Sequence, residues 1–333
     1  METPNQPLNS PATRSESVQG PSWVPRVLIG GLITLTIFLA VGISAPSNRV
    51  ANVPGNRDVA VVSAAVSGPF ENTSLLAKSA IVVDIQSGAT LFARNPDIQL
   101  PLASLTKVPL ALVVSEVLPL DSRITIPHDI PQVGKFETLS GGVQWPLQEV
   151  IDFTLITSSN DGADILAEAA NGPVRQKFSG APTLNSTLWR MNALANELGL
   201  SQTYFLNVSG LDISTTLAGA YGSARDVAIL FEYASQSNPT VFSGTARGNV
   251  LLTSEYGDKQ TVAYNTNETE AEIPGLILGK TGFTDLAGGN LAIVFDVGIA
   301  HPVVVVILGS TKEGRFEDAR KLVEATRAAI ALQ

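Results

Sequence analysis

Short apolar runs that suit buried β-strands lie near both ends of the C-terminal three quarters of this chain. Two of them fall near residues 79–86 and 89–94, and three more near residues 277–284, 289–297 and 302–310. Apolar runs of this length between turn residues are typical of strands. A sheet assembled from both chain ends is most simply antiparallel, and we expect these strands to form one five-stranded sheet with helices on both faces.

The segments between and after these strands have helical patterns. Residues 108–114 are apolar all round, which suits a helix buried in a core. Leu147–Ile156 is amphipathic, and residues 161–170 predict another helix. The last segment carries apolar or small side chains at helical spacing, which should pack on the sheet: Phe316, Ala319, Leu322, Val323, Thr326 and Ile330. The expected fold class is therefore α/β (α+β), an antiparallel five-stranded sheet flanked by helices, plus a mostly helical lobe over about residues 104–236.

The first 75 residues have a different pattern. Residues 1–26 are polar and rich in Pro, Ser and Asn, so we expect a disordered N-terminal tail. Residues 27–45 are 19 consecutive uncharged residues, long enough to be a transmembrane anchor. They also suit the apolar part of a signal peptide cleaved near Ala45, although the long leader favours the anchor. We expect residues 46–75 to be a linker and residues 76–333 to be the folded domain.

Composition narrows the possible chemistry. A chain of 333 residues with 44% hydrophobic content can build one sizeable core. The absence of cysteine excludes disulfides and thiolate metal sites. The only histidines, His128 and His301, have no metal-like spacing, so neither a metal, another cofactor nor a histidine-based triad is expected. A net charge of −9 argues against binding to nucleic acid.

Three short motifs carry the candidate chemistry. Ser104-Leu105-Thr106-Lys107 is followed by Ser158-Ser159-Asn160 and then by Lys280-Thr281-Gly282. Each motif alone is a weak signal. Together and in this order, S-x-x-K, S-x-N and K-T-G describe a serine acyl-transfer site in which a lysine replaces the usual histidine base.

The first motif predicts a nucleophile and its base. If a helix begins at or just before Ser104, residues three apart share a face, and the amine of Lys107 can lie beside the Ser104 hydroxyl. Pro109 is tolerated only near a helix start, which fixes that start close to Ser104. Burial disfavours an ammonium, and a nearby cation such as Lys280 lowers the pKa of Lys107 further. We therefore expect Ser104 to be the nucleophile and a neutral Lys107 to be the general base.

The second motif lies on the connection between two predicted helices, where side chains can point into a cleft. Ser158 is placed to relay a proton to a leaving amine, and Asn160 to hydrogen-bond the acyl side of a peptide substrate. The alternative is that Ser159, Asn160 and Asp161 simply cap the next helix.

The third motif lies in the β-compatible stretch Leu276–Phe283, which we expect to line the edge of the cleft. Lys280 and Thr281 would hold a carboxylate, and Gly282 would let the substrate backbone approach closely. The backbone amide of Phe283 would pair with that of Ser104 as an oxyanion hole. The alternative is an ordinary hairpin strand with a surface lysine.

With these motifs the chain resembles the low-molecular-mass penicillin-binding proteins, the D-alanyl-D-alanine carboxypeptidases of serine peptidase family S11. The likeness runs from about Ser79 to Ala329. Beyond the three motifs it rests on further segments: residues 80–84 with Ser87-Gly88 and Leu91, residues 191–211, Ala224-Arg225-Asp226, Phe283-Thr284-Asp285, Ala287-Gly288 and Arg315-Phe316. The resemblance implies a fold like that of β-lactamases and transpeptidases.

The resemblance also implies a function. A member of this family would remove the terminal D-alanine from peptidoglycan stem peptides through an acyl-enzyme on Ser104, and β-lactams would be covalent inhibitors. Because the stem peptide exists outside the cytoplasmic membrane, the catalytic domain would lie on the extracytoplasmic side, tethered by residues 27–45 as a single-pass anchor. Nothing in the sequence indicates the oligomeric state.

Three other functions stay open. A DD-endopeptidase that cuts cross-links would use the same acyl-enzyme chemistry. A class A β-lactamase would add an E-x-x-L-N glutamate, but no such pattern follows Asn160, and Glu168 and Glu197 both lie in helix-like runs. A wall-associated pseudoenzyme that only binds peptides is disfavoured, because the serine and both lysines are intact.

Overall fold

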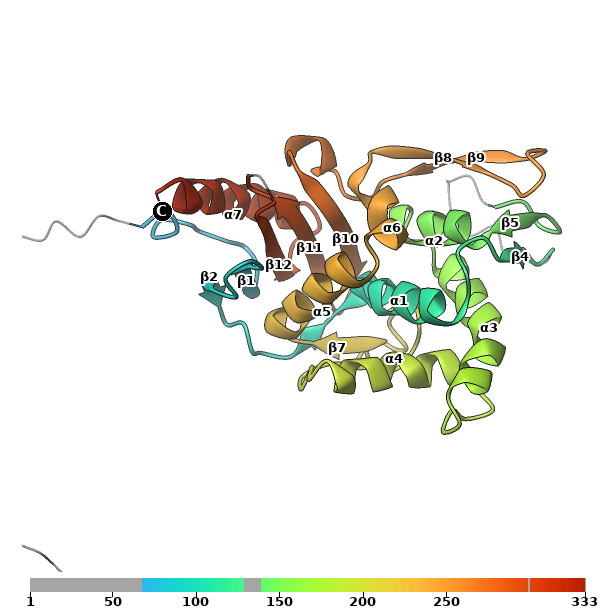
Figure 1. Cartoon of the computed structure of the whole chain (residues 1–333). Helices are drawn as coiled ribbons and strands as arrows, with labels where there is room; N and C mark the ends of the chain where they lie inside the picture. Colours follow the sequence, from blue (N-terminus) through green and yellow to red (C-terminus); the bar gives the residue numbers. More distant parts are fainter. Residues whose placement is uncertain (1–67, 129–138, 299, 333) are drawn as a thin grey trace, which may run out of the picture. The chain divides into compact units, whose positions relative to one another are not determined.

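The computed structural model describes residues 68–128, 139–298 and 300–332 (Figure 1). The predicted tail over 1–26, the predicted anchor or signal peptide over 27–45 and most of the predicted linker over 46–75 lie outside these residues. In the described part of the chain, no helix is long and apolar enough to cross a membrane. The end of the predicted linker packs on the domain, because Phe70 stacks on Phe92 with ring centroids 5.4 Å apart and Leu75 is buried.

The predicted five-stranded antiparallel sheet is confirmed. Strand β1 from the start of the domain pairs with β12 from its end, with Ser79 opposite Leu308 and Asp84 opposite Val303. The sheet therefore combines strands from the start and from the end of the domain (Figure 1). In spatial order, the strands are β10 (Leu276–Thr284), β11 (Gly288–Asp296), β12 (Pro302–Ser310), β1 (Ser79–Asp84) and β2 (Thr90–Arg94).

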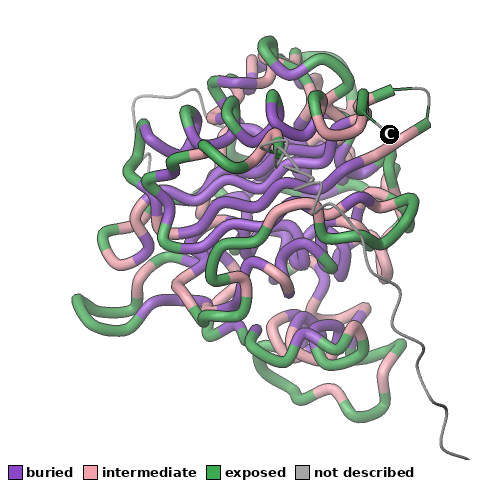
Figure 2. The backbone as a smooth tube through the Cα atoms, turned by 90° about the vertical axis from the view of Figure 1, so that its left-hand side faces the viewer, coloured by how far each residue is buried: buried purple, intermediate pink, exposed green. Residues whose placement is uncertain are grey.

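Alternation along the strands explains how both faces of the sheet are covered. In β12, Val303 and Val305 belong to the apolar cluster under α7 (Gly314–Ala331), whereas Val304 and Val306 belong to the cluster shared with the other helices. Helix α7 packs on one face, and α5 (Ala224–Ser237) packs on β1, β11 and β12. The central strands are accordingly a continuous buried layer (Figure 2). Of the side chains predicted to face the sheet from the last helix, all are buried except the half-buried Ile330.

The region between the two sets of strands is mostly helical, as predicted. Helix α1 (Lys107–Val117) lies at its centre and contacts α2 (Leu147–Ile156), α3 (Asn160–Lys177), α4 (Ser186–Glu197) and α5. Every residue of α1 from Lys107 to Val114 is buried, which accounts for the apolar run over 108–114. Helix α3 runs beyond its predicted end at Ala170 and through Pro173, because Val174 is buried in the core. Tertiary packing here outweighs local helix propensity.

Shorter elements, which the apolar pattern did not reveal, complete the domain. A three-stranded sheet has the order β3, β7, β6, and two further pairs join β4 to β5 and β8 to β9. One short helical turn, η2, packs against α2, α6 and β10. The bounds are β3 (Leu100–Pro101), β4 (Arg123–Thr125), β5 (Gln144–Pro146), β6 (Tyr204–Phe205), β7 (Ala220–Gly222), β8 (Asn249–Thr253), β9 (Gln260–Tyr264), α6 (Pro239–Phe242), η1 (Ala103–Thr106), η2 (Ser243–Ala246) and η3 (Glu270–Glu272).

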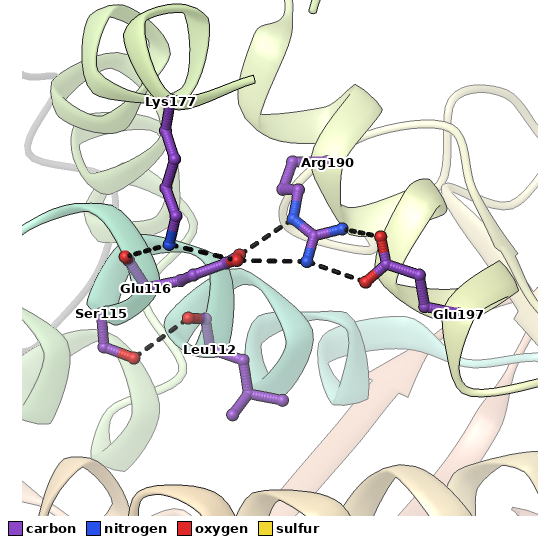
Figure 3. Close-up of polar contacts among 6 residues, drawn as sticks. All are labelled: Leu112, Ser115, Glu116, Lys177, Arg190 and Glu197. Atoms are coloured by element: carbon purple, nitrogen blue, oxygen red, sulfur yellow. Dashed lines mark hydrogen bonds and ion pairs between the residues drawn. The ribbon is translucent and has the colours of Figure 1, made fainter. Parts of the chain in front are cut away.

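An ion-pair network fixes the end of α1 that is farthest from Lys107 (Figure 3). Glu116 of α1 accepts from Arg190 of α4 at 2.9 Å and lies 3.4 Å from Lys177 of α3. The nearly buried Arg190 guanidinium also pairs with Glu197 at 2.6 Å and lies 4.6 Å from the Phe178 ring centroid. These ion pairs join α1, α3 and α4 at this end of the lobe.

Candidate active site

Ser104 lies on the short turn η1, which runs directly into α1. The preceding residue, Ala103, has a left-handed backbone with φ of +49°, which is uncommon for a residue with a side chain. Gly210, with φ of +79°, lies against this turn, and a Cβ atom at that position would overlap the Ala103 carbonyl oxygen. Glycine therefore lets the segment 207–211 pack directly on the turn that carries the serine.

The Lys107 side chain is completely buried, and its amine is surrounded by three oxygens. Lys107 Nζ lies 2.8 Å from Ser104 Oγ, 2.8 Å from Asn160 Oδ1 and 2.9 Å from the carbonyl oxygen of Ser209. A neutral amine that donates its two N–H bonds to the amide and carbonyl oxygens keeps its lone pair for the hydroxyl proton of Ser104. The expected pairing of Lys107 with Ser104 is present, in the geometry of a base beside its nucleophile.

Burial lowers the pKa of Lys107 to about 7, against an opposing effect of the Asp164 carboxylate. A substantial fraction of the amine is then neutral near physiological pH, as a general base requires. Burial also lowers the pKa of Lys280, and the positive charges of Lys107 and Arg315 lower it further. We expected Lys280 to lower the pKa of Lys107, but Lys280 is not among the causes of the shift of Lys107, and the charge of Lys107 instead lowers the pKa of Lys280.

The second motif divides its side chains between helix capping and the site. Ser159 Oγ accepts a hydrogen bond from the Gly162 amide at 3.0 Å and so caps α3. Asn160 makes no cap and turns instead to Lys107. Ser158 has a left-handed backbone with φ of +61° and accepts a hydrogen bond from Lys280 Nζ at 2.8 Å. The capping alternative therefore holds for Ser159 and not for Asn160.

The third motif lies on β10 and forms the opposite wall. Lys280 is buried and donates to Ser158 Oγ and to the Thr281 carbonyl oxygen, both at 2.8 Å. A Cβ atom on Gly282 would lie 2.9 Å from the Leu102 carbonyl oxygen and 3.3 Å from the Ser104 amide nitrogen. Glycine at this position is thus needed for β10 to approach the Ser104 turn, which is a reason in addition to the predicted approach of a substrate.

A cavity of about 230 Å³ brings the three motifs together. Lys107, Lys280 and Gly282 are not among its lining residues, because they lie behind the wall. Residues from six separate segments of the chain line it: Ser104, Ser158, Asn160, Leu211, Thr266, Thr281, Phe283, Thr284 and Arg315.

The sequence did not predict a role for four of these residues, Leu211, Thr266, Thr284 and Arg315. Thr266 Oγ1 lies 2.6 Å from Thr281 Oγ1, and Arg315 Nη1 donates to the Gly282 carbonyl oxygen at 2.8 Å. Arg315 is buried, and its Nε has no hydrogen-bond partner within the described part of the chain. In the sequence, Arg315 stood out only as part of the Arg315-Phe316 pair of the family resemblance, at the start of the last helix. The structure therefore adds a cation to the cavity wall.

A serine hydroxyl beside a buried lysine, with a second serine–lysine pair across the cavity, defines a serine acyl-transfer enzyme. The antiparallel sheet and the helical lobe are those of penicillin-binding proteins and transpeptidases. The chain belongs to the D-alanyl-D-alanine carboxypeptidase family, peptidase S11, whose family model matches residues 64–312. It is accordingly a serine peptidase of the carboxypeptidase class.

Individual relatives agree with this family. The chain is 31% identical to the D-alanyl-D-alanine carboxypeptidase DacB2 of Mycobacterium tuberculosis, over 72% of this chain and 77% of the relative. It is 29% identical to a D-alanyl-D-alanine endopeptidase of Pseudomonas aeruginosa, over 74% and 76%. Two other carboxypeptidases of the family are longer, and the chain spans 61% and 60% of their length.

A solved structure is similar as well. Penicillin-binding protein D2 of Listeria monocytogenes, in a cefotaxime-bound form, superposes with a TM-score of 0.63 at 28% identity. The match covers 76% of this chain and 98% of that one. The likeness therefore extends over nearly the whole of the Listeria structure.

Replacing Gly210 by alanine should slow acylation of Ser104 by a fluorescent penicillin roughly tenfold or more, because small displacements of catalytic groups are costly. The new Cβ would push the segment 207–211 away from Ala103 and move the Ser209 carbonyl oxygen off Lys107. Gly199→Ala is the matched control, since Gly199 has φ of +72° but open space around its Cβ position. Equal labelling rates in the two variants would contradict this account of Gly210.

Proposed function

We propose that this chain removes the terminal D-alanine from peptidoglycan stem peptides as a D-alanyl-D-alanine carboxypeptidase. The observation that carries the proposal is the buried Lys107 amine, held 2.8 Å from Ser104 Oγ by Asn160 and the Ser209 carbonyl. This arrangement suits acyl transfer from a peptide to serine. Membership of the carboxypeptidase family points to the D-alanyl-D-alanine terminus as the peptide.

The first step of the proposed reaction forms an ester on Ser104. Ser104 Oγ attacks the carbonyl carbon of the penultimate D-alanine while Lys107 Nζ takes the hydroxyl proton. The oxyanion that forms is stabilised by the backbone amides of Ser104 and Phe283. When the C–N bond breaks, the proton that Lys107 took is passed by way of Ser158, which is hydrogen-bonded to Lys280, to the leaving D-alanine amine, and Lys107 is neutral again. Water then attacks the ester carbonyl while Lys107 accepts a proton from it, and that proton returns to Ser104 Oγ as the ester C–O bond breaks and the shortened peptide leaves.

The free carboxylate of the substrate needs positive charge and hydroxyl donors. Thr281, Thr266 and Arg315 supply both from the cavity wall. Lys280, which the sequence predicted as a carboxylate anchor, donates to Ser158 and does not line the cavity. We therefore infer that Arg315 supplies the charge that the carboxylate meets, and that Lys280 acts mainly through Ser158.

β-Lactams are the covalent inhibitors that this site should accept. A β-lactam presents a strained amide and a carboxylate, so it can acylate Ser104 as the peptide does. The cefotaxime-bound form of the Listeria protein supports this inference. Because no E-x-x-L-N glutamate follows Asn160, the acyl-enzyme formed with a β-lactam should be long-lived.

A DD-endopeptidase is the second candidate function. The relative from Pseudomonas aeruginosa, which matches about as well as several carboxypeptidases, is named a D-alanyl-D-alanine endopeptidase. The two reactions share the acyl-enzyme on Ser104 and differ in the leaving group, which is free D-alanine in one and a cross-linked side-chain amine in the other.

Digestion of purified muropeptides should separate these two functions. Incubation with pentapeptide monomers and cross-linked dimers, followed by mass spectrometry, should convert pentapeptides to tetrapeptides and leave dimers intact. Ser104→Ala, which lacks the nucleophile, should leave both substrates unchanged. Cleavage of dimers without trimming of pentapeptides would replace the carboxypeptidase proposal with the endopeptidase.

We also propose that residues 27–45 anchor the protein in the cell membrane, with the catalytic domain on the extracytoplasmic side. The support is the uncharged run of 19 residues and the location of stem peptides outside the membrane. At about 1.5 Å rise per residue, such a helix just spans a bilayer core.

Deleting residues 1–45 should release a protein that still binds penicillin but no longer fractionates with membranes. The full-length chain should sediment with membranes and keep its N-terminal segment. Recovery of the full-length product in the soluble fraction, with an N-terminus near Pro46, would show a cleaved signal peptide and refute the anchor.

A further inference from the structure

A second and larger cavity, of about 370 Å³, shares no lining residue with the active-site cavity. Its wall includes two carboxylates of α3, Asp164 and Glu168, and two residues of a neighbouring segment, Asn207 and Val208. No step of the proposed reaction uses this cavity. The segments that line it nevertheless also contact Lys107, and one of the two carboxylates can thereby influence the reaction.

The two segments that bound this cavity are those that hold the Lys107 amine. Asn160 accepts from Lys107 Nζ and begins α3, and Asp164 follows four residues later on the same side of that helix. The Ser209 carbonyl also accepts from Lys107 Nζ, and Asn207 and Val208 lead directly into Ser209. Of the two carboxylates in the cavity wall, Asp164 is therefore the one nearer along α3 to Asn160, which holds the buried amine.

We propose that Asp164 is a positioning residue for the acyl-transfer reaction, and that its carboxylate acts through the field on Lys107 rather than by contact with substrate. The proposal rests on the role given above to Lys107 as the base for Ser104. No direct hydrogen bond from Asp164 to Lys107 is part of it, since the three oxygens around the amine come from Ser104, Asn160 and Ser209.

The direction of the effect follows from the sign of the charge. Burial lowers the pKa of Lys107 and the Asp164 carboxylate raises it, so the value of about 7 is the outcome of opposing effects. Burial and the neighbouring Asp161 raise the pKa of Asp164 itself, while the Lys107 charge lowers it. Charge on Asp164 thus favours the protonated form of Lys107.

The other charges around Lys107 act differently. Burial and the charges of Lys107 and of Arg315 on α7 lower the pKa of Lys280 on β10, whereas the pKa of Lys107 responds to burial and to Asp164. Glu168 lies one helical turn farther from Asn160 than Asp164 does, in the same cavity. Asp164, although exposed, is therefore the carboxylate that opposes the effect of burial on the pKa of Lys107. The opposition matters because a base works best with a pKa near the working pH.

The test is the pH dependence of the second-order rate at which a fluorescent penicillin labels Ser104. The parent protein should show an acid limb with a midpoint near the pKa of Lys107, about 7. Asp164→Asn, which removes the charge and keeps the shape, should move that midpoint to lower pH. Below the parental midpoint, the variant should then label faster than the parent, and at high pH it should label no faster.

Two further variants make the result specific. Glu168→Gln removes the same charge from the same cavity one turn away and should leave the midpoint close to the parental value. Asp164→Glu keeps the charge and should restore it. Thermal unfolding of each variant shows whether the domain is intact, and a merely structural defect would lower the rate at every pH without moving the midpoint.

An unmoved acid limb in Asp164→Asn, or an equal shift in Glu168→Gln, would overturn the role of Asp164. Failure of the parent protein to label at all would be a different result, because it would count against the proposed acylation of Ser104. The two failures are therefore distinguishable in one set of measurements.

Discussion

The structure depends on burying one lysine amine without a carboxylate in contact with it. Lys107 Nζ has three neutral oxygens within 2.9 Å, and in the described part of the chain no acidic group pairs with it. A charged ammonium is costly in such a place, so the neutral amine becomes accessible near pH 7. A buried amine would destabilise an ordinary protein core, but here burial of the Lys107 amine produces a base beside Ser104.

The surrounding fold can be understood as support for this buried amine. Helix α1 is apolar on all sides, so its first turn lies deep in the domain, and the ion pairs of Arg190 fix its other end. Gly210 and Gly282 bring the loop and the β10 strand against the Ser104 turn. The left-handed backbone at Ala103 and Ser158 adds local strain that this packing holds in place.

Much of this arrangement could be predicted from the sequence, because it is encoded in local patterns. The five strands and Leu147–Ile156 appear as apolar runs, and Ser104, Lys107, Ser158, Asn160 and Lys280 stand in short motifs. The parts that escaped prediction depend on long-range packing. Thr266 and Arg315 reach the cavity only because distant segments meet there, and Ser209 contributes a backbone oxygen that no side-chain motif records. The extension of α3 past Ala170 also depends on tertiary contacts.

The most direct measurement is the titration of the Lys107 side chain by nuclear magnetic resonance, on protein with isotope-labelled lysine. The Lys107 signal, assigned by its loss in Lys107→Arg, should titrate with a midpoint of about 7 in the free protein. A Lys107 midpoint above about 9 would mean a stable ammonium at neutral pH, and it would contradict the assignment of this amine as the base that activates Ser104.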